Sequence, residues 1–265
     1  ARYYEKSGAL LDMVKNHMLQ ILALTAMEPP ADMKTESIRD EKIKIFKSLA
    51  NFNSEMVTNY VVRGQYGDGK IDGEEVINYR DEDNVASDSR TETFVALKLF
   101  INNMRWSGVP FYIKTGKRLN KKFTEVIIEF KSSFHPAYSK HFIDLKPNLL
   151  VIKVQPEEGV YFQFNAKELD SKENIVPVKM DFCQNCGVEI NSPEAYERLI
   201  YSVIIGDQTL FTRWDEVEYS WRFVDQIAEA WSKEEIDFPN YSAGSNGPQE
   251  AQDLLVNDGR KWWGF

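Results

Sequence analysis

A series of short apolar runs in the middle of the chain limits the possible folds more than any other feature. The runs are rich in β-branched and aromatic residues and are bounded by Gly, Pro and Asn, which is typical of β-strands. They are TFVALKLFI (93–101), VPFYIKT (109–115), TEVIIEFK (124–131), NLLVIKVQP (148–156) and GVYFQFNAK (159–167). A parallel return would need a crossover of about a dozen residues. Connections as short as EEG (157–159) therefore predict antiparallel neighbours.

Helical spacing occurs on both sides of these runs. Near the N-terminus, apolar residues recur three and four positions apart up to Pro29 and leave few polar positions, which predicts a buried helix. The main stripe is Leu11, Val14, Met18, Ile21 and Leu22, and the other faces carry Leu10, Met13, Leu19 and Leu24. Further helices are expected at 37–49 with Ser37 as N-cap, at 193–207 and at 220–231. The predicted class is α+β, a large mainly antiparallel β-sheet with helices packed on one face.

Composition excludes several functional classes. The chain has 32 Lys and Arg against 41 Asp and Glu, a net charge of −9, so its surface as a whole repels polyanions. We therefore expect neither nucleic acid nor an anionic membrane as a partner. No stretch approaches the ~18 to 20 apolar residues of a membrane span, and the first residues lack the pattern of a signal peptide. A cytoplasmic protein is expected.

The segment YGDGKIDGEEV (66–76) resembles a calcium-binding loop only in part. Alignment of Gly69 with the glycine that such loops require puts Gly64 and Tyr66 at the first and third ligand positions. Neither residue offers a carboxylate there, so an acidic surface loop is favoured.

Both cysteines of the chain lie in CQNC (183–186). Cys183 and Cys186 have the spacing of a zinc hook or a redox pair, and His135 and His141 could in principle add ligands. The histidine spacing is long for zinc, and the context lacks the strand and helix of a redox motif. Two ordinary cysteines in a reducing compartment, and no metal, are therefore favoured.

The segment KTGKRLNKK (114–122), here called the lysine loop, is strongly basic in an acidic chain. Clustered ammonium groups on a loop between strands can hold a phosphate. A solvated turn that discourages strand pairing explains the same residues equally well. The cationic members are Lys114, Lys117, Arg118, Lys121 and Lys122.

His17 lies within the predicted N-terminal helix. Its neighbours three and four positions away are mainly apolar, so the ring is expected to be desolvated and neutral, the state that a general base needs. A structural histidine bonded to the backbone is the commoner case, and spacing alone favours it.

Longer stretches resemble the C-terminal part of glucose-6-phosphate dehydrogenase, bacterial members above all. They are YYEKSGALLDMVKNHMLQILALTAMEPP, RDEKIKIFKSL, GVPFYIKTGKRLNKKFTEVIIEFK, PEAYERLIYSVIIGDQTLFTRWDEVEYSWRFVD and YSAGSNGPQEAQDLL, colinear and nearly end to end. The resemblance implies an enzyme that oxidises glucose 6-phosphate to 6-phosphoglucono-lactone with reduction of NADP or NAD, the first step of the pentose phosphate pathway. It further implies that His17 is the general base, that Asp12 contacts the sugar, and that Lys117 and Lys122 contact its phosphate.

Two departures from the family pattern accompany this resemblance. The Rossmann domain and the D-H-Y-L-G-K-E segment, which supplies a carboxylate partner for the histidine, have no counterpart in residues 1–265. The N-terminal NAD(P)-binding domain is therefore expected to be absent from this chain, which would leave it without a bound coenzyme and inactive alone. Some eukaryotic relatives bind a second, structural NADP through basic residues where this chain has Phe123 and Ile127, so no structural nucleotide is expected.

The resemblance also implies a homodimer, possibly a tetramer, that associates through the sheet. The alternative is a stand-alone, non-catalytic module that dimerises or binds a sugar phosphate. A coding region that continues upstream of Ala1 into a Rossmann pattern would distinguish the two.

Overall fold

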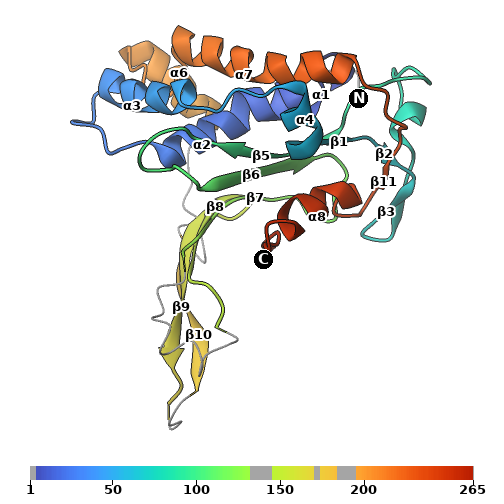
Figure 1. Cartoon of the computed structure of the whole chain (residues 1–265). Coiled ribbons are helices and arrows are strands. Elements are labelled where there is room, and N and C mark those ends of the chain that lie inside the picture. The colour runs from blue at the N-terminus through green and yellow to red at the C-terminus, as the bar shows by residue number, and fades with distance from the viewer. Residues whose placement is uncertain (1–3, 132–144, 170–173, 184–194, 265) are drawn as a thin grey trace. The chain divides into compact units, whose positions relative to one another are not determined.

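The computed structural model describes residues 4–131, 145–169, 174–183 and 195–264 (Figure 1). The chain divides into a first unit, residues 1–120 and 194–262, and a second unit, residues 121–193 and 263–265. Helices and antiparallel sheets occur together, so the predicted α+β class is confirmed. The sheet itself differs from the prediction, because the described residues form a three-stranded sheet in one unit and a four-stranded sheet in the other.

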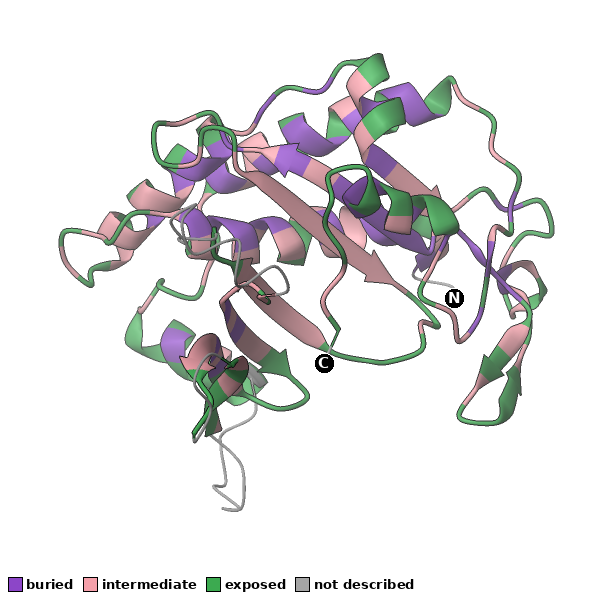
Figure 2. Ribbon diagram, turned by 60° about the horizontal axis from the view of Figure 1, so that its bottom comes forward, coloured by how far each residue is buried: buried purple, intermediate pink, exposed green. Residues whose placement is uncertain are grey.

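The sheet of the first unit is built around a strand that is buried on both faces. Its order is β1 (Val61–Gly64), β5 (Phe94–Phe100) and β6 (Pro110–Gly116), with antiparallel pairing throughout. Val95, Leu97 and Leu99 of β5 face one side, whereas Phe94 and Ala96 belong to the cluster on the other. All five side chains are fully buried, and Figure 2 shows buried residues along the strands and helices of this unit.

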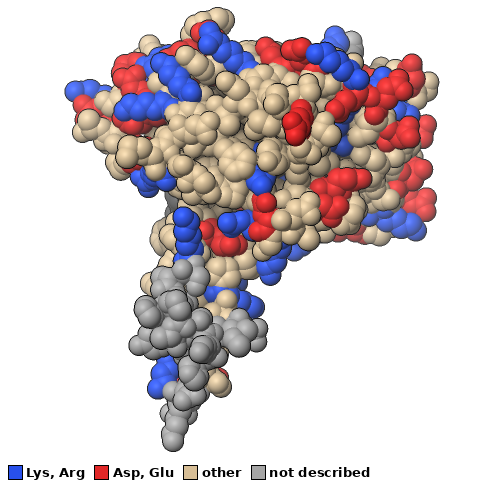
Figure 3. Space-filling view, in the orientation of Figure 1, with Lys and Arg blue, Asp and Glu red and all other residues tan. Residues whose placement is uncertain are grey.

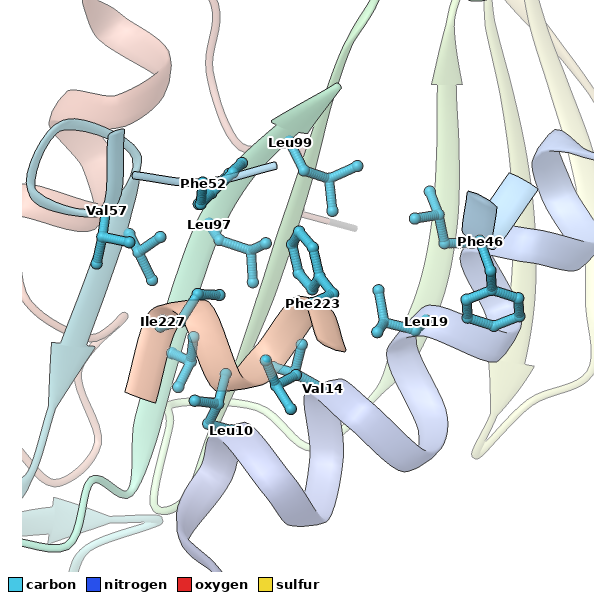
Figure 4. Close-up of a cluster of buried hydrophobic side chains, with 14 of the residues drawn as sticks. Leu10, Val14, Leu19, Phe46, Phe52, Val57, Leu97, Leu99, Phe223 and Ile227 are labelled. Atoms are coloured by element: carbon cyan, nitrogen blue, oxygen red, sulfur yellow. The ribbon is translucent and has the colours of Figure 1, made fainter. Parts of the chain in front are cut away.

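A layer of helices covers one face of this sheet (Figure 1). Figure 4 shows Leu10, Val14 and Leu19 directed toward Phe223 and Ile227, next to the side chains of β5. Full burial of each such side chain contributes roughly 1.5–3 kcal/mol. The helices of the first unit are α1 (Tyr4–Ala9), η1 (Leu10–Met18), α2 (Leu19–Ala26), α3 (Thr35–Lys47), α4 (Ser54–Tyr60), α6 (Ala195–Ile205), α7 (Trp214–Ser232) and α8 (Gln249–Val256).

The opposite face is also covered, which the prediction of helices packed on one face did not include. Ala251, Leu254 and Leu255 of α8 pack with Phe94 and with a group of buried tyrosines. The tyrosines are Tyr66, Tyr79 and Tyr241. The short elements here are β2 (Tyr66–Gly67), paired in parallel with β11 (Tyr241–Ser242), the hairpin of β3 (Gly69–Ile71) and β4 (Glu74–Val76), and η2 (Tyr79–Asp81).

The second unit contains an antiparallel sheet of order β10-β9-β8-β7. Its strands are β7 (Thr124–Glu129), β8 (Leu149–Gln155), β9 (Gly159–Lys167) and β10 (Ile175–Cys183). Three of them follow predicted runs, whereas β10 was not predicted. Leu149, Val151 and Tyr161 are buried on one face, where Ile127 and Trp263 pack against them.

Residues Leu10–Met18 form a π-helix, which the sequence spacing did not predict. The backbone N–H of Leu19 bonds the carbonyl of Val14, five residues back, instead of four as in an α-helix. The buried positions are therefore Leu10, Val14 and Leu19, not the expected stripe of Leu11, Val14 and Met18.

The starts of two helices also differ from the prediction. Helix α3 begins at Thr35, and Ser37, the expected N-cap, instead donates a hydrogen bond to Asp32 at 2.6 Å. Helix α7 begins at Trp214, six residues before the predicted start at Ser220, because Glu216 accepts the backbone N–H of Arg213. The same carboxylate is fully buried and forms an ion pair with Lys42 at 2.6 Å.

We expect Gly8 to be required at the junction of α1 and η1. It has a φ of 62°, and a Cβ atom there would lie 2.3 Å from Oε1 of Glu92. Gly8→Ala should therefore lower the free energy of unfolding, measured by urea denaturation, by at least about 1 kcal/mol more than a matched control.

The control is Gly73→Ala, because Gly73 also has a positive φ of 87° but nothing lies within 4 Å of the position that its Cβ would take. It carries the backbone strain without the steric clash. Equal losses in the two variants would contradict a role for the contact between Gly8 and Glu92.

Candidate functional site

Asp12 and His17 both lie on η1, and the π-helix brings them toward one side. In an α-helix of 3.6 residues per turn, residues five apart are rotated by about 140°. Bonds from residue i to i+5 widen the turn, so residues five apart come close to the same face. Asp12 is half-buried and His17 is exposed.

The exposure of His17 corrects two predictions. We expected an imidazole desolvated among apolar neighbours, in a helix that is apolar nearly all round. Instead Asn16 and His17 face solvent, and Leu24 on α2 is 52% exposed. The i, i+3 and i+4 neighbours that suggested burial belong to an α-helix, and η1 does not have that winding.

Lys117 directly follows β6 and lies beside Tyr4. Its backbone N–H donates to the carbonyl of Thr93 at 2.9 Å, and its Nζ lies 4.5 Å from the centroid of the Tyr4 ring. The lysine is exposed, whereas Tyr4 is 6% exposed. Such a cation and ring attract each other, which orients the ammonium group while it remains accessible to a ligand.

Tyr4 also brings Asp12 into this site. The pKa of the Tyr4 phenol is raised, first by burial and then by the nearby carboxylates of Glu92 and Asp12. Lys117, which lies over the ring, and Asp12, whose charge acts on the phenol, are therefore both linked to Tyr4 although they are far apart in the sequence. Tyr4 was not identified from the sequence, because nothing in YYEKSG (3–8) distinguishes it from an ordinary core tyrosine.

Lys122 is exposed and belongs to the second unit. The assignment of Lys122 to the substrate phosphate therefore rests on the resemblance alone. Lys114, also in the lysine loop, lies over Trp262 at 4.8 Å from the ring centroid, and burial lowers its pKa.

Glu92 holds the start of η1, a role that the sequence did not indicate. Its carboxylate accepts the backbone N–H of Leu10 at 2.9 Å, and its carbonyl accepts that of Ala9 at 3.0 Å. A carboxylate at a helix N-terminus is favoured by the helix dipole. Burial nevertheless raises the pKa of Glu92, against the opposing effect of these bonds and of Arg63.

A cavity of about 370 Å³ lies behind this helix start, lined by Leu11, Arg63, Arg90 and Trp231 among others. Arg63 donates to the carbonyls of Trp231 and Glu234, and Arg90 donates to the carbonyl of Glu234. Because these cations cap the end of α7, we do not assign the cavity to substrate.

The remaining sequence candidates lie in an exposed hairpin or near the end of β10, or fall outside the described residues. Residues 69–76 form an exposed hairpin, and in Figure 3 acidic side chains gather at the right-hand end of the first unit, where Figure 1 places β3. Among the described residues, no group of three His, Cys, Asp or Glu could hold a metal ion. His135, His141 and Cys186 lie outside those residues. Cys183 is disulfide-bonded, which corrects the expectation of a reduced cysteine.

None of the described helices is long and apolar enough to cross a membrane.

Comparison with known proteins identifies the family. A family model described as "Glucose-6-phosphate dehydrogenase, C-terminal domain" matches residues 1–263. The chain is 53% identical over 263 residues to glucose-6-phosphate 1-dehydrogenase of Bacillus subtilis (strain 168), covering 99% of this chain and 54% of the relative. It is 48% identical over 264 residues to the enzyme of Chlamydia pneumoniae, covering 98% and 51%.

Solved structures give the same result. Glucose-6-phosphate dehydrogenase in complex with its substrate glucose-6-phosphate matches with a TM-score of 0.83 and 32% identity, over 99% of this chain and 52% of that one. Glucose-6-phosphate 1-dehydrogenase from Mycobacterium avium matches with a TM-score of 0.77 and 33% identity, over 99% and 52%. The chain thus spans about half the length of the relatives it matches.

The raised pKa of Glu92 predicts how its replacement changes stability with pH. Below its ordinary value of 4.5 the carboxyl is neutral in both the folded and unfolded states. As the pH rises through the higher folded value, the folded state increasingly bears the cost of a buried charge, so stability from this group is lost. Glu92→Gln keeps an acceptor for Leu10 without that charge.

We therefore expect the unfolding free energy of Glu92→Gln, relative to wild type, to rise between pH 4.5 and pH 8, as measured by urea denaturation at several pH values. The control is Glu250→Gln, at an exposed position on α8 where the substitution removes no buried charge. A difference at Glu92 that is flat or falls with pH would contradict the assignment.

Proposed function

Because this chain belongs to the glucose-6-phosphate dehydrogenase C-terminal domain family, we propose that it is the substrate-binding and dimerisation part of that dehydrogenase. The whole enzyme would oxidise glucose 6-phosphate to 6-phosphoglucono-lactone in the cytoplasm, with NADP or NAD as acceptor. The observation that carries the proposal is the exposed ammonium group of Lys117 over the ring of Tyr4 on α1, with Asp12 and His17 on η1, the helix that directly follows.

In this proposal His17 is the general base. The proton of the sugar C1 hydroxyl passes to the imidazole, the C1–H bond breaks with its electron pair, and a carbonyl forms at C1. A nicotinamide coenzyme, when bound, would supply the acceptor for that hydride. Solvent exposure of His17 in this chain is consistent with a base that must reach a bound sugar, and Asp12 on the same side of η1 would orient the sugar hydroxyls.

Lys117 and Lys122 would bind the phosphate of the substrate. The Nζ of Lys117 is oriented over Tyr4 yet the residue remains exposed. Fixed ammonium groups attract a phosphate dianion without needing bidentate geometry. The two lysines would stabilise the bound substrate and the transition state equally, because the phosphate does not react. Their loss should therefore weaken substrate binding more than it slows the chemical step.

We assign the coenzyme to a part of the intact enzyme other than this chain. No strand, glycine-rich turn and helix of the dinucleotide-binding type occurs among the described elements, and the relatives are about twice as long as this chain. This chain alone would then be inactive. Ile127, one of the positions compared with the structural NADP site, packs in the apolar cluster of Leu149 and Val151, which supports the expectation of no second nucleotide.

The second unit offers a surface for the proposed homodimer. Strand register places apolar residues in cross-strand rows on the face opposite Leu149 and Val151. The rows are Val126, Ile152, Val160 and Phe182, then Ile128, Leu150, Phe162 and Met180, then Phe164 and Val178. Met180 and Phe182 are both 66% exposed. A contiguous apolar sheet face of this kind is typical of a protein interface.

Kinetics of the intact enzyme test the assigned roles. His17→Asn should lower kcat by about a hundredfold to ten-thousandfold, because it removes the general base, and should change KM for glucose 6-phosphate little. Lys122→Ala should raise that KM by about tenfold, because it removes a charged hydrogen-bond donor, and should change kcat little.

Lys121→Ala is the matched control, since Lys121 is the exposed neighbour of Lys122. It should leave both parameters within about twofold of wild type. If both variants lower kcat and raise KM to the same extent, the roles assigned to His17 and Lys122 are wrong. An intact protein that binds glucose 6-phosphate but never oxidises it would instead support the non-catalytic module.

Sedimentation velocity tests the dimer surface. Met180→Lys introduces a charge into the apolar rows and should convert the intact enzyme to a smaller species at micromolar concentration. Asp181→Lys, one residue away on the opposite face of β10, should sediment like wild type. Dissociation in both variants, or in neither, would argue against this surface.

A further inference from the structure

The backbone of Lys117 is held at both of its polar groups. Its N–H donates to the carbonyl of Thr93 at 2.9 Å, and its carbonyl accepts the hydroxyl of Tyr241 at 2.9 Å. Thr93 and Tyr241 also bond each other, Oγ1 to Oη, at 2.9 Å. The two residues that hold Lys117 therefore form one connected unit.

These bonds form a chain with one direction. Tyr241 has a single hydroxyl proton and gives it to Lys117, so Thr93 must donate to Tyr241. Oγ1 of Thr93 in turn accepts the backbone N–H of Tyr66 at 3.1 Å. Thr93 and Tyr66 are buried, and Tyr241 is 7% exposed. Buried chains of this kind hold their members in one arrangement, because breaking one link leaves a polar group without a partner.

The same C-terminal segment holds the next residues of the lysine loop. Gly244 donates its N–H to the carbonyl of Arg118 at 2.7 Å, and Asn120 donates to the carbonyl of Ser245 at 3.0 Å. Arg118 has a φ of 54°, a left-handed conformation that is costly for a residue with a side chain. Such strain persists only where surrounding contacts maintain it, and here residues 241–245 supply those contacts.

We propose that Tyr241 is a positioning residue for substrate binding, which acts by fixing the backbone of Lys117 so that its ammonium group is directed over Tyr4 toward the substrate phosphate. The inference rests on the proposed function of Lys117. It assigns a role to the YSAGSNG segment (241–247), whose hydroxyl and backbone groups bond the backbone of the lysine loop.

Tyr241→Phe in the intact enzyme removes one hydroxyl and keeps the ring that packs on Phe94. We expect KM for glucose 6-phosphate, and its Kd by calorimetry, to rise about fivefold, the usual effect of one lost hydrogen bond, with the loss in KM and not in kcat. In a Lys117→Ala background the same substitution should have no further effect on KM, because no ammonium group is left to position.

Tyr79→Phe is the matched control. Tyr79 is buried in the same tyrosine cluster, but its hydroxyl donates to Glu5 at 2.8 Å, away from the lysine loop. If Tyr241→Phe matches this control, or if its effect on KM persists in the Lys117→Ala background, the inference is wrong. If Lys117→Ala itself leaves KM unchanged, the proposed role of Lys117 fails instead, which separates the two conclusions.

Discussion

Strand β5 carries apolar side chains on both faces and must therefore be covered twice. Leu97 and Leu99 require the helix layer that contains η1, whereas Phe94 and Ala96 require α8 and the buried tyrosines. The helix layer lies on one face of β5, and α8 with the buried tyrosines lies on the other. Both contribute residues to the candidate site. The residue just before β5, Thr93, meets the lysine loop, and Glu92 next to it anchors η1. Burial of this strand thus fixes two adjacent residues, of which Glu92 holds the start of η1 and Thr93 holds the backbone of Lys117.

Much of the fold could be predicted from local pattern, and the exceptions have physical causes. The predicted strands from β5 to β9 match because their β-branched and aromatic runs end at clear turn residues. Strand β10 was missed because Pro177, Lys179 and Asp181 interrupt its apolar character, and only pairing with β9 identifies it. The π-helix was missed because Leu10 to Met18 satisfies an α-helical pattern equally well, and the bonding that decides between them depends on anchoring at Glu92.

Recognition of the site depended on resemblance more than on residue chemistry. Spacing left His17 and the lysine loop undecided, and its one specific expectation, a desolvated imidazole, was wrong. Tyr4, Glu92 and Tyr241 could not be found from sequence because each acts on a distant residue. The hydroxyl of Tyr241 reaches across 124 positions to Lys117, and the carboxylate of Glu92 across 82 to Leu10. Such contacts leave no periodic signal.

The π-helical winding of η1 also limits how this part of the gene can change in length. In an α-helix, loss of one residue rotates the side chains that follow it by about 100° and shifts them by about 1.5 Å. Here, deletion of one residue between Asp12 and His17 would put the two side chains four positions apart and favour ordinary α-helical winding, with Leu19 displaced from the core. Asp12 and His17 could then stay on one side of the helix only if each apolar residue after the deletion took the core position of its neighbour. The number of residues in this segment is therefore as constrained as their identity.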